Sequence, residues 1–109
     1  MVMGPAGRFT LLFAPEVVFD LWALDRKHHF LLRREIALQL TSQPDVETRN
    51  RKPLDVPAPF GAQWELRLGP NNRFRVFYEV DRASLLVTVL AIGVKERNVL
   101  RVGTEEFAT

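Results

Sequence analysis

The chain has 109 residues, of which 47% are hydrophobic and 26% are charged, and its mean hydropathy is −0.05. These values are typical of one folded domain and leave no room for two independent cores. Cysteine is absent, which excludes a disulfide scaffold, a thiolate nucleophile and a Cys-ligated metal site. No apolar run approaches the roughly 20 residues of a membrane helix, and the start of the chain does not resemble a secretory signal. We therefore expect a single domain over residues 1–109 that works in the cytoplasm, without membrane association.

The net charge of +2 is distributed unevenly along the chain. Residues 1–47 carry five basic and six acidic side chains, whereas residues 48–101 carry ten basic and five acidic ones. Eight of those ten basic residues are arginines, whose planar guanidinium group bonds two phosphate oxygens at once. A basic half of this kind favours a surface for a polyanion, and a solvated basic face is the plainer alternative.

A strand and two helices are the first elements predicted along the chain. Residues 8–13 are mostly apolar and rich in strand-forming types. Pro15 suits the first turn of a helix, and apolar residues then recur at helical spacing to about Asp25. A second helical pattern runs from about Lys27 to Leu40. The pair predicts a helical hairpin, whose inward side chains are expected to include Trp22, Phe30, Leu31, Ile36 and Leu40.

An extended connection over residues 44–62 follows the hairpin and contains four of the seven prolines. Connections of this length are usually functional or mobile. Three strand-like runs come next, over residues 63–68, 73–80 and 85–92, and the third is almost wholly apolar, as in an interior strand. The tail from residue 95 is expected to hold no more than a helical turn and a trailing segment. The order β-α-α-β-β-β predicts an α+β fold, with the helical hairpin packed on a small, mainly antiparallel sheet.

The turn at residues 69–72 allows the pairing of its two strands to be predicted. Pairing Leu66 with Val76 places the apolar residues of both strands on one face. The same register sets Arg67 directly opposite Arg75 on the other face. Like charges in this position are destabilising, so the pair is better explained by a bound anion than by folding.

Two interpretations of this arginine pair stay open at the level of the sequence. The first is a solvated face on which the arginines form ion pairs with Glu65 and Glu79. The second is a phosphate-binding face, to which the basic cluster at residues 49–52 and the segment 95–97 would add further positive charge.

Four blocks of the sequence resemble the RelE/ParE toxin superfamily, and they are Arg49–Leu54, Trp64–Leu68, Phe74–Asp81 and Ala91–Asn98. The resemblance covers most of the chain. It implies a small ribonuclease fold with a twisted sheet. It also implies a cognate antitoxin, a short, acidic and helical protein from the adjacent gene that blocks the toxin and recruits it to operator DNA. RelE-type members cut messenger RNA in the ribosomal A site, whereas ParE-type members poison DNA gyrase.

The resemblance also implies a set of site residues. Arg75 would stabilise the phosphorane charge as the ribose 2′-hydroxyl attacks the adjacent phosphate, and Lys95 or Arg101 would assist the leaving oxygen. Arg67 matches a basic position of the family, whereas Glu65 replaces another one and would accept the hydroxyl proton. Well-known RelE enzymes have a late tyrosine that this chain lacks. The corresponding position falls near Arg101. Contacts to RNA are expected from Arg49, Arg51, Lys52, Arg73, Arg97 and Arg101.

The function implied is that of a RelE-like, ribosome-dependent endonuclease of messenger RNA that needs no metal or other cofactor. Its expected partners are the antitoxin, messenger RNA and the ribosome, with operator DNA reached only through the antitoxin. The reversed charge at Glu65 and the missing tyrosine favour the alternative, a gyrase poison or a degenerate toxin that acts only by binding. His28 and His29 are assigned to a helix end rather than to catalysis, and Tyr78 to a buried hydroxyl with a hydrogen-bond partner.

Overall fold

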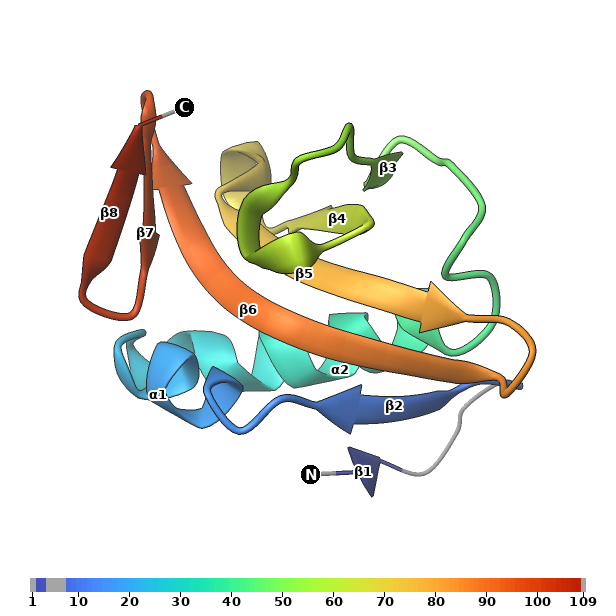
Figure 1. Cartoon of the computed structure of the whole chain (residues 1–109). Coiled ribbons are helices and arrows are strands. Elements are labelled where there is room, and N and C mark those ends of the chain that lie inside the picture. The colour runs from blue at the N-terminus through green and yellow to red at the C-terminus, as the bar shows by residue number, and fades with distance from the viewer. Residues whose placement is uncertain (1, 4–7, 109) are drawn as a thin grey trace.

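The structure is a computed structural model that describes residues 2–3 and 8–108 (Figure 1). Its strands are β1 (Val2–Met3), β2 (Thr10–Phe13), β3 (Arg51–Pro53), β4 (Trp64–Leu68), β5 (Phe74–Asp81), β6 (Leu86–Glu96), β7 (Val99–Val102) and β8 (Glu105–Ala108). Its α-helices are α1 (Val17–Trp22) and α2 (His29–Leu40), and short 3-10 helices cover η1 (Arg26–His28), η2 (Pro59–Gly61) and η3 (Pro70–Asn72).

The strands form one sheet in the order β1-β2-β6-β5-β4-β3, in which β2 runs parallel to β6 and the other pairs are antiparallel. The far end of β6 pairs with β7, which pairs with β8. Figure 1 shows the long, curved β6 at the centre, the β7–β8 hairpin standing at one end, and both helices on one side. The predicted α+β class and the mainly antiparallel sheet are confirmed.

The predicted register of β4 and β5 is also confirmed. Leu66 pairs with Val76, and Arg67 lies directly opposite Arg75. The tight turn between these strands depends on Gly69, because a Cβ atom there would lie 2.6 Å from the Phe74 ring. The turn thus brings the two arginines together through purely local interactions.

The main core fills the space between the helices and one face of the sheet. Helix α2 contributes Leu32, Ile36 and Leu40, which repeat every four residues and so lie along one stripe. The expectation for Phe30 was therefore wrong, since it lies outside this stripe and is 75% exposed. Trp22 was also wrongly placed in the core, because it lies at the end of the short helix α1 and is 71% exposed.

The tail contradicts its prediction, because it forms strands β7 and β8 rather than a helical turn. These strands build a second, smaller core on the other face of the sheet, together with the connection before β4. Its buried members are Ala62, Phe77, Ala91, Leu100 and Val102. β6 is therefore covered on both faces along its second half, which confirms the interior position predicted for it. No helix in the described ranges has the length and apolar character needed to cross a membrane.

Candidate nucleic-acid interface

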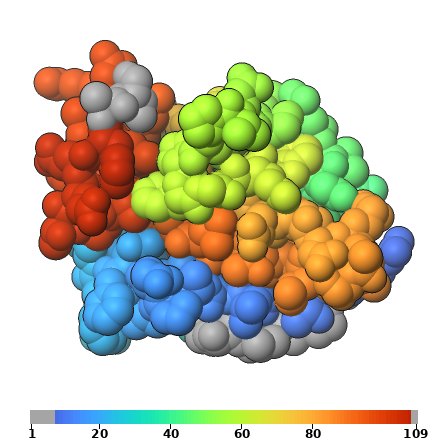
Figure 2. All heavy atoms as spheres, viewed as in Figure 1, coloured from blue at the N-terminus to red at the C-terminus, as the bar shows by residue number. Residues whose placement is uncertain are grey.

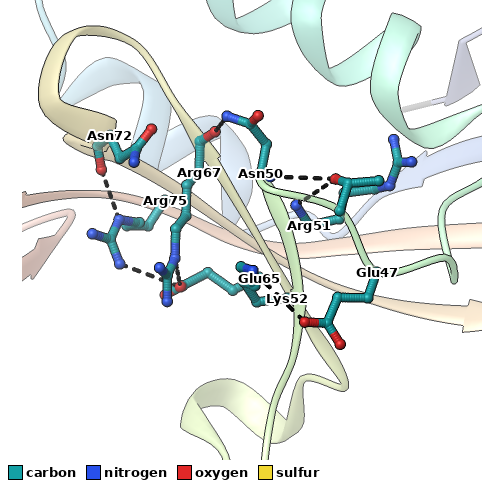
Figure 3. Close-up of polar contacts among 9 residues, drawn as sticks. Glu47, Asn50, Arg51, Lys52, Glu65, Arg67, Asn72 and Arg75 are labelled. Carbon is teal, nitrogen blue, oxygen red and sulfur yellow. Dashed lines mark hydrogen bonds and ion pairs between the residues drawn. The ribbon is translucent and has the colours of Figure 1, made fainter.

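The opposed arginines of β4 and β5 share one carboxylate oxygen (Figure 3). Arg67 Nε donates to Glu65 Oε1 at 2.7 Å, and Arg75 Nη1 donates to the same oxygen at 3.2 Å. The Glu65 side chain is only 9% exposed, against 12% for Arg75 and 35% for Arg67. The anion that faces this arginine pair is therefore supplied by the chain itself, as the ion-pair interpretation predicted for Glu65. Glu79, the second partner of that interpretation, is exposed and forms no ion pair with a described residue.

Backbone contacts fix both arginines in place. Arg75 Nε donates to the Asn72 carbonyl oxygen at 2.7 Å, so the β4–β5 turn orients its guanidinium group. On β4, Asn50 Nδ2 donates to the Arg67 carbonyl oxygen at 2.8 Å, and the Arg67 N–H donates back to the Asn50 carbonyl oxygen at 2.8 Å. Asn50 precedes β3, so this edge strand positions the arginine pair from the side (Figure 3).

Arg75 also borders a wider depression, which we call the basic hollow. It has a volume of about 550 Å³, and its lining residues are Pro70, Asn71, Arg73, Arg75, Lys95, Glu96 and Arg97. Strand pairing creates this group, because the Lys95 N–H donates to the Arg73 carbonyl oxygen at 2.7 Å and Gly93 lies opposite Arg75. The described lining thus contains four basic residues and one acidic residue, Glu96.

The positive charge of the basic hollow is only partly balanced within the chain. Glu96 accepts from Arg73 Nη2 at 2.9 Å, and Arg73 Nε is buried without a hydrogen-bond partner among the described residues. Lys95 and Arg97 form no ion pair with any described carboxylate. An unpaired ammonium and an unpaired guanidinium group beside Arg75 make this region suited to a phosphate group.

The structure corrects the expectation for Arg51. Its residue is only 8% exposed, and its guanidinium group faces inward, toward α2. Nη1 donates to the backbone oxygen of Gln39 at 3.1 Å and to Gln39 Oε1 at 2.7 Å, and Nε donates to the Val46 carbonyl oxygen at 3.0 Å. Arg51 thus ties the connection after α2 to the end of that helix, and it is not available to contact RNA.

Of the other residues expected to contact RNA, Arg73 and Arg97 line the basic hollow. The remaining three, Arg49, Lys52 and Arg101, are outside its lining. Arg49 is exposed at the β3 edge, and Lys52 lies 3.6 Å from Glu47. Arg101 lies opposite Val94 in β6 and so faces away from Lys95. Its Nη2 donates to Glu106 at 2.8 Å, and this hydrogen bond raises the pKa of the Arg101 guanidinium group.

The two histidines occupy a helix end, as predicted. His28 is the residue before α2, and His29 is its first residue; His29 Nε2 lies 2.8 Å from the Leu21 carbonyl oxygen. No pattern in the sequence indicated that His28 would approach the basic strands. In the structure its ring lies 4.9 Å from the Phe74 ring, and it lines a hollow of about 200 Å³ that also contains Arg73 and Arg101.

No protein-family model matches the chain, and no curated protein matches its sequence. A search of solved structures finds a chain of the RelBE2 toxin–antitoxin complex from Mycobacterium tuberculosis, with 22% sequence identity and a TM-score of 0.61. The match covers 81% of this chain and 99% of that chain. At this identity the likeness is one of fold, and it agrees with the fold that the sequence blocks implied. The chain therefore has the RelE-like α+β fold.

Proposed function

We propose that this protein is the toxin of a type II toxin–antitoxin system and cuts messenger RNA on the ribosome. The observation that carries the proposal is the basic hollow, whose described lining contains Arg73, Arg75, Lys95 and Arg97 and a single acidic residue, Glu96. The shared fold with a chain of a toxin–antitoxin complex supports the same assignment.

The proposed reaction is attack of a ribose 2′-hydroxyl on the adjacent phosphate. The 2′-oxygen forms a bond to phosphorus, the bond from phosphorus to the 5′-oxygen breaks, and the products are a cyclic phosphate and a 5′-hydroxyl. Arg75 and Lys95 stabilise the extra negative charge of the phosphorane. Arginine stays protonated at neutral pH, so the proton acceptor in this scheme is Glu65 and the donor to the leaving oxygen is Lys95.

The geometry around Glu65 decides how well it can serve in this role. Both arginines bond to its Oε1 atom, and no described residue donates to Oε2. Oε2 is therefore the atom that would take the hydroxyl proton. Arg67 would act as a positioning residue, since its Nε holds the carboxylate 2.7 Å away.

The proposed partners follow from the charge of the basic hollow. A short antitoxin with an acidic segment would cover it and exclude RNA by occupying the same cations. Operator DNA would be reached through the antitoxin alone, and messenger RNA and the ribosome would be bound when the antitoxin is absent. These partners place the protein in the cytoplasm.

A second candidate function is favoured by the pairing of Glu65 with both arginines. This carboxylate neutralises one of the two positive charges that the family resemblance assigns to the cleavage site. A toxin that acts only by binding, for example on DNA gyrase, would need no free charge at this position.

Inducing the chain in a bacterial host, with and without its neighbouring gene, tests the proposal when RNA 5′ ends are mapped. Growth arrest with in-frame cuts in translated messages, relieved by the neighbour, is the expected result. Arrest with intact RNA would support the binding-only candidate. Absence of arrest from a folded protein would overturn both toxin functions.

A further inference from the structure

A second hollow, which we call the acidic pocket, lies where α1, the η2 turn and the β7–β8 hairpin meet. Figure 2 shows these three segments, in blue, yellow-green and red, approaching one another on the same face. The pocket has a volume of about 370 Å³, and its lining residues are Ala14, Glu16, Asp20, Phe60, Leu90, Val102, Glu105 and Phe107. The described lining is thus mostly apolar, and its charged side chains are all acidic.

Two aromatic residues, Phe60 and Phe107, line the acidic pocket, and the backbone of Phe60 is strained. Phe60 has a φ of 61°, in the left-handed region that non-glycine residues rarely adopt. Its ring lies 5.4 Å from the Phe77 ring and 5.5 Å from the Phe107 ring, and it stays 40% exposed. Strain of this kind persists where the surrounding packing imposes it and is often found at binding sites.

Asp20 lies at the acidic end of the pocket and is only 7% exposed. Its Oδ2 atom accepts from the Ile92 N–H at 3.0 Å, while no described residue donates to Oδ1. Burial raises the pKa of Asp20; the hydrogen bond from Ile92 opposes this effect, and the nearby charge of Glu16 adds to it. A cation in the pocket would offset the two effects that disfavour the charged form of Asp20, which are its burial and the negative charge of Glu16.

The apolar wall indicates what kind of cation fits. Among the described residues, no group of three or more acidic or histidine side chains is placed to hold a metal ion. An organic cation with an apolar stem instead matches aromatic rings beside carboxylates, because its stem packs on the rings while its charge reaches the acids.

We propose that the acidic pocket binds an arginine or lysine side chain of a partner polypeptide. Its charge pairs with Asp20 and Glu105. A polypeptide is favoured over a free amine because α1 also presents two exposed aromatic side chains, Phe19 at 63% and Trp22 at 71%, whose rings lie 5.5 Å apart. Apolar residues elsewhere in the same polypeptide would pack on this pair. The site shares no residue with the basic hollow, so it does not depend on the proposed nuclease activity.

Nuclear magnetic resonance titration of the whole chain tests the proposal with the peptide N-acetyl-Leu-Arg-Leu-amide. The control peptide carries citrulline, which has nearly the shape of arginine without its charge. We expect saturable shifts at the backbone amides of the lining residues, with a Kd of about 1 mM. Binding of the citrulline peptide should be about tenfold weaker.

Two neighbouring residues of β8 provide matched variants of the protein. Glu105 lines the acidic pocket, whereas Glu106 pairs with Arg101 and is absent from its lining. Glu105→Gln should weaken binding of the arginine peptide about threefold, and adding Glu16→Gln should bring the loss to about tenfold. Glu106→Gln, with the same change in net charge, should leave it unchanged. Absence of saturable shifts at the pocket, equal binding of both peptides, or equal effects of the two β8 variants would each overturn the proposal.

Discussion

Arg67 and Arg75 lie directly opposite each other on β4 and β5, and both donate to the same oxygen of Glu65. Two like charges in facing positions normally weaken a strand pair. Here one carboxylate bridges them, so the three side chains form a single unit with one net positive charge. Removing Glu65 should therefore change both the stability of the sheet and its affinity for an anion such as RNA.

Glu65→Gln should lower the free energy of unfolding by about 1–2 kcal/mol at low salt, because two facing arginines then lose their shared anion. The loss should shrink as added salt screens the repulsion between the arginines. Urea unfolding at two ionic strengths measures both effects. Glu79→Gln, on the exposed side of β5, is the control and should change little. A loss that does not respond to salt would contradict this account of the arginine pair.

The same variant separates the two candidate functions. If Glu65 accepts the 2′-hydroxyl proton, Glu65→Gln should reduce RNA cleavage by about 10²–10⁴-fold. If Glu65 serves only to neutralise the arginines, the substitution should not reduce cleavage: the parent protein and Glu65→Gln should either both cut RNA or both leave it intact. Glu65→Gln should then bind single-stranded RNA more tightly than the parent protein. Comparing cleavage and RNA affinity in the two proteins decides between these roles.

Arg75→Ala should abolish growth arrest without unfolding the protein, because Arg75 borders the basic hollow while Glu65 keeps Arg67 as a partner. Arg82→Ala is a matched control, since Arg82 is an arginine bonded to Asp45 at the turn after β5, away from the hollow. Growth after induction, together with circular dichroism of the purified variants, measures the result. Full toxicity of Arg75→Ala would remove this residue from the proposed mechanism.

Arg51 and Arg49 offer a direct contrast between a structural and a surface arginine. Arg51→Met should destabilise the fold by about 2–3 kcal/mol, because the backbone oxygens of Gln39 and Val46 lose their donor. Arg49→Met should leave stability unchanged and instead weaken RNA binding. Thermal unfolding and an RNA-binding assay on both variants test this assignment, which would be wrong if Arg51→Met melted like the parent chain.

Tyr78 should govern stability at alkaline pH. Its hydroxyl is buried and donates to the Pro44 carbonyl oxygen at 2.6 Å. Burial raises the pKa of Tyr78 above its usual range, and the nearby charge of Arg51 opposes that effect. The unfolded chain releases this proton near pH 10 while the folded chain retains it, so stability should fall as the pH rises above about 10.

Tyr78→Phe should lower stability at neutral pH by about 1–2 kcal/mol, through loss of the bond to Pro44. It should also remove the alkaline decline that Tyr78 causes, so the two proteins should converge as the pH rises. The chain has one tyrosine, so phenolate absorbance reports Tyr78 alone. Ionisation of the folded protein near pH 10 would show that the hydroxyl is not held as the structure describes.

The sequence by itself determined the features that depend on neighbouring residues. Alternation of apolar residues and the chemistry of the turn at residues 69–72 were enough to pair Leu66 with Val76, and with them Arg67 with Arg75. The excess of arginine after residue 48 likewise indicated a basic face, and the sequence blocks implied the fold that a solved structure shares. Strand periodicity and turn geometry are local, so they can be read without knowing the rest of the molecule.

Only the tertiary structure decided which faces are covered and which charges meet. Trp22 and Phe30 lie on apolar patterns, yet they are exposed because the sheet reaches only one side of each helix. Arg51 belongs to a basic cluster, yet it turns inward to α2. The acidic pocket brings together Asp20 and Glu105, which lie near opposite ends of the sequence. Burial and charge pairing depend on contacts between distant segments, and no local pattern in the sequence specifies those contacts.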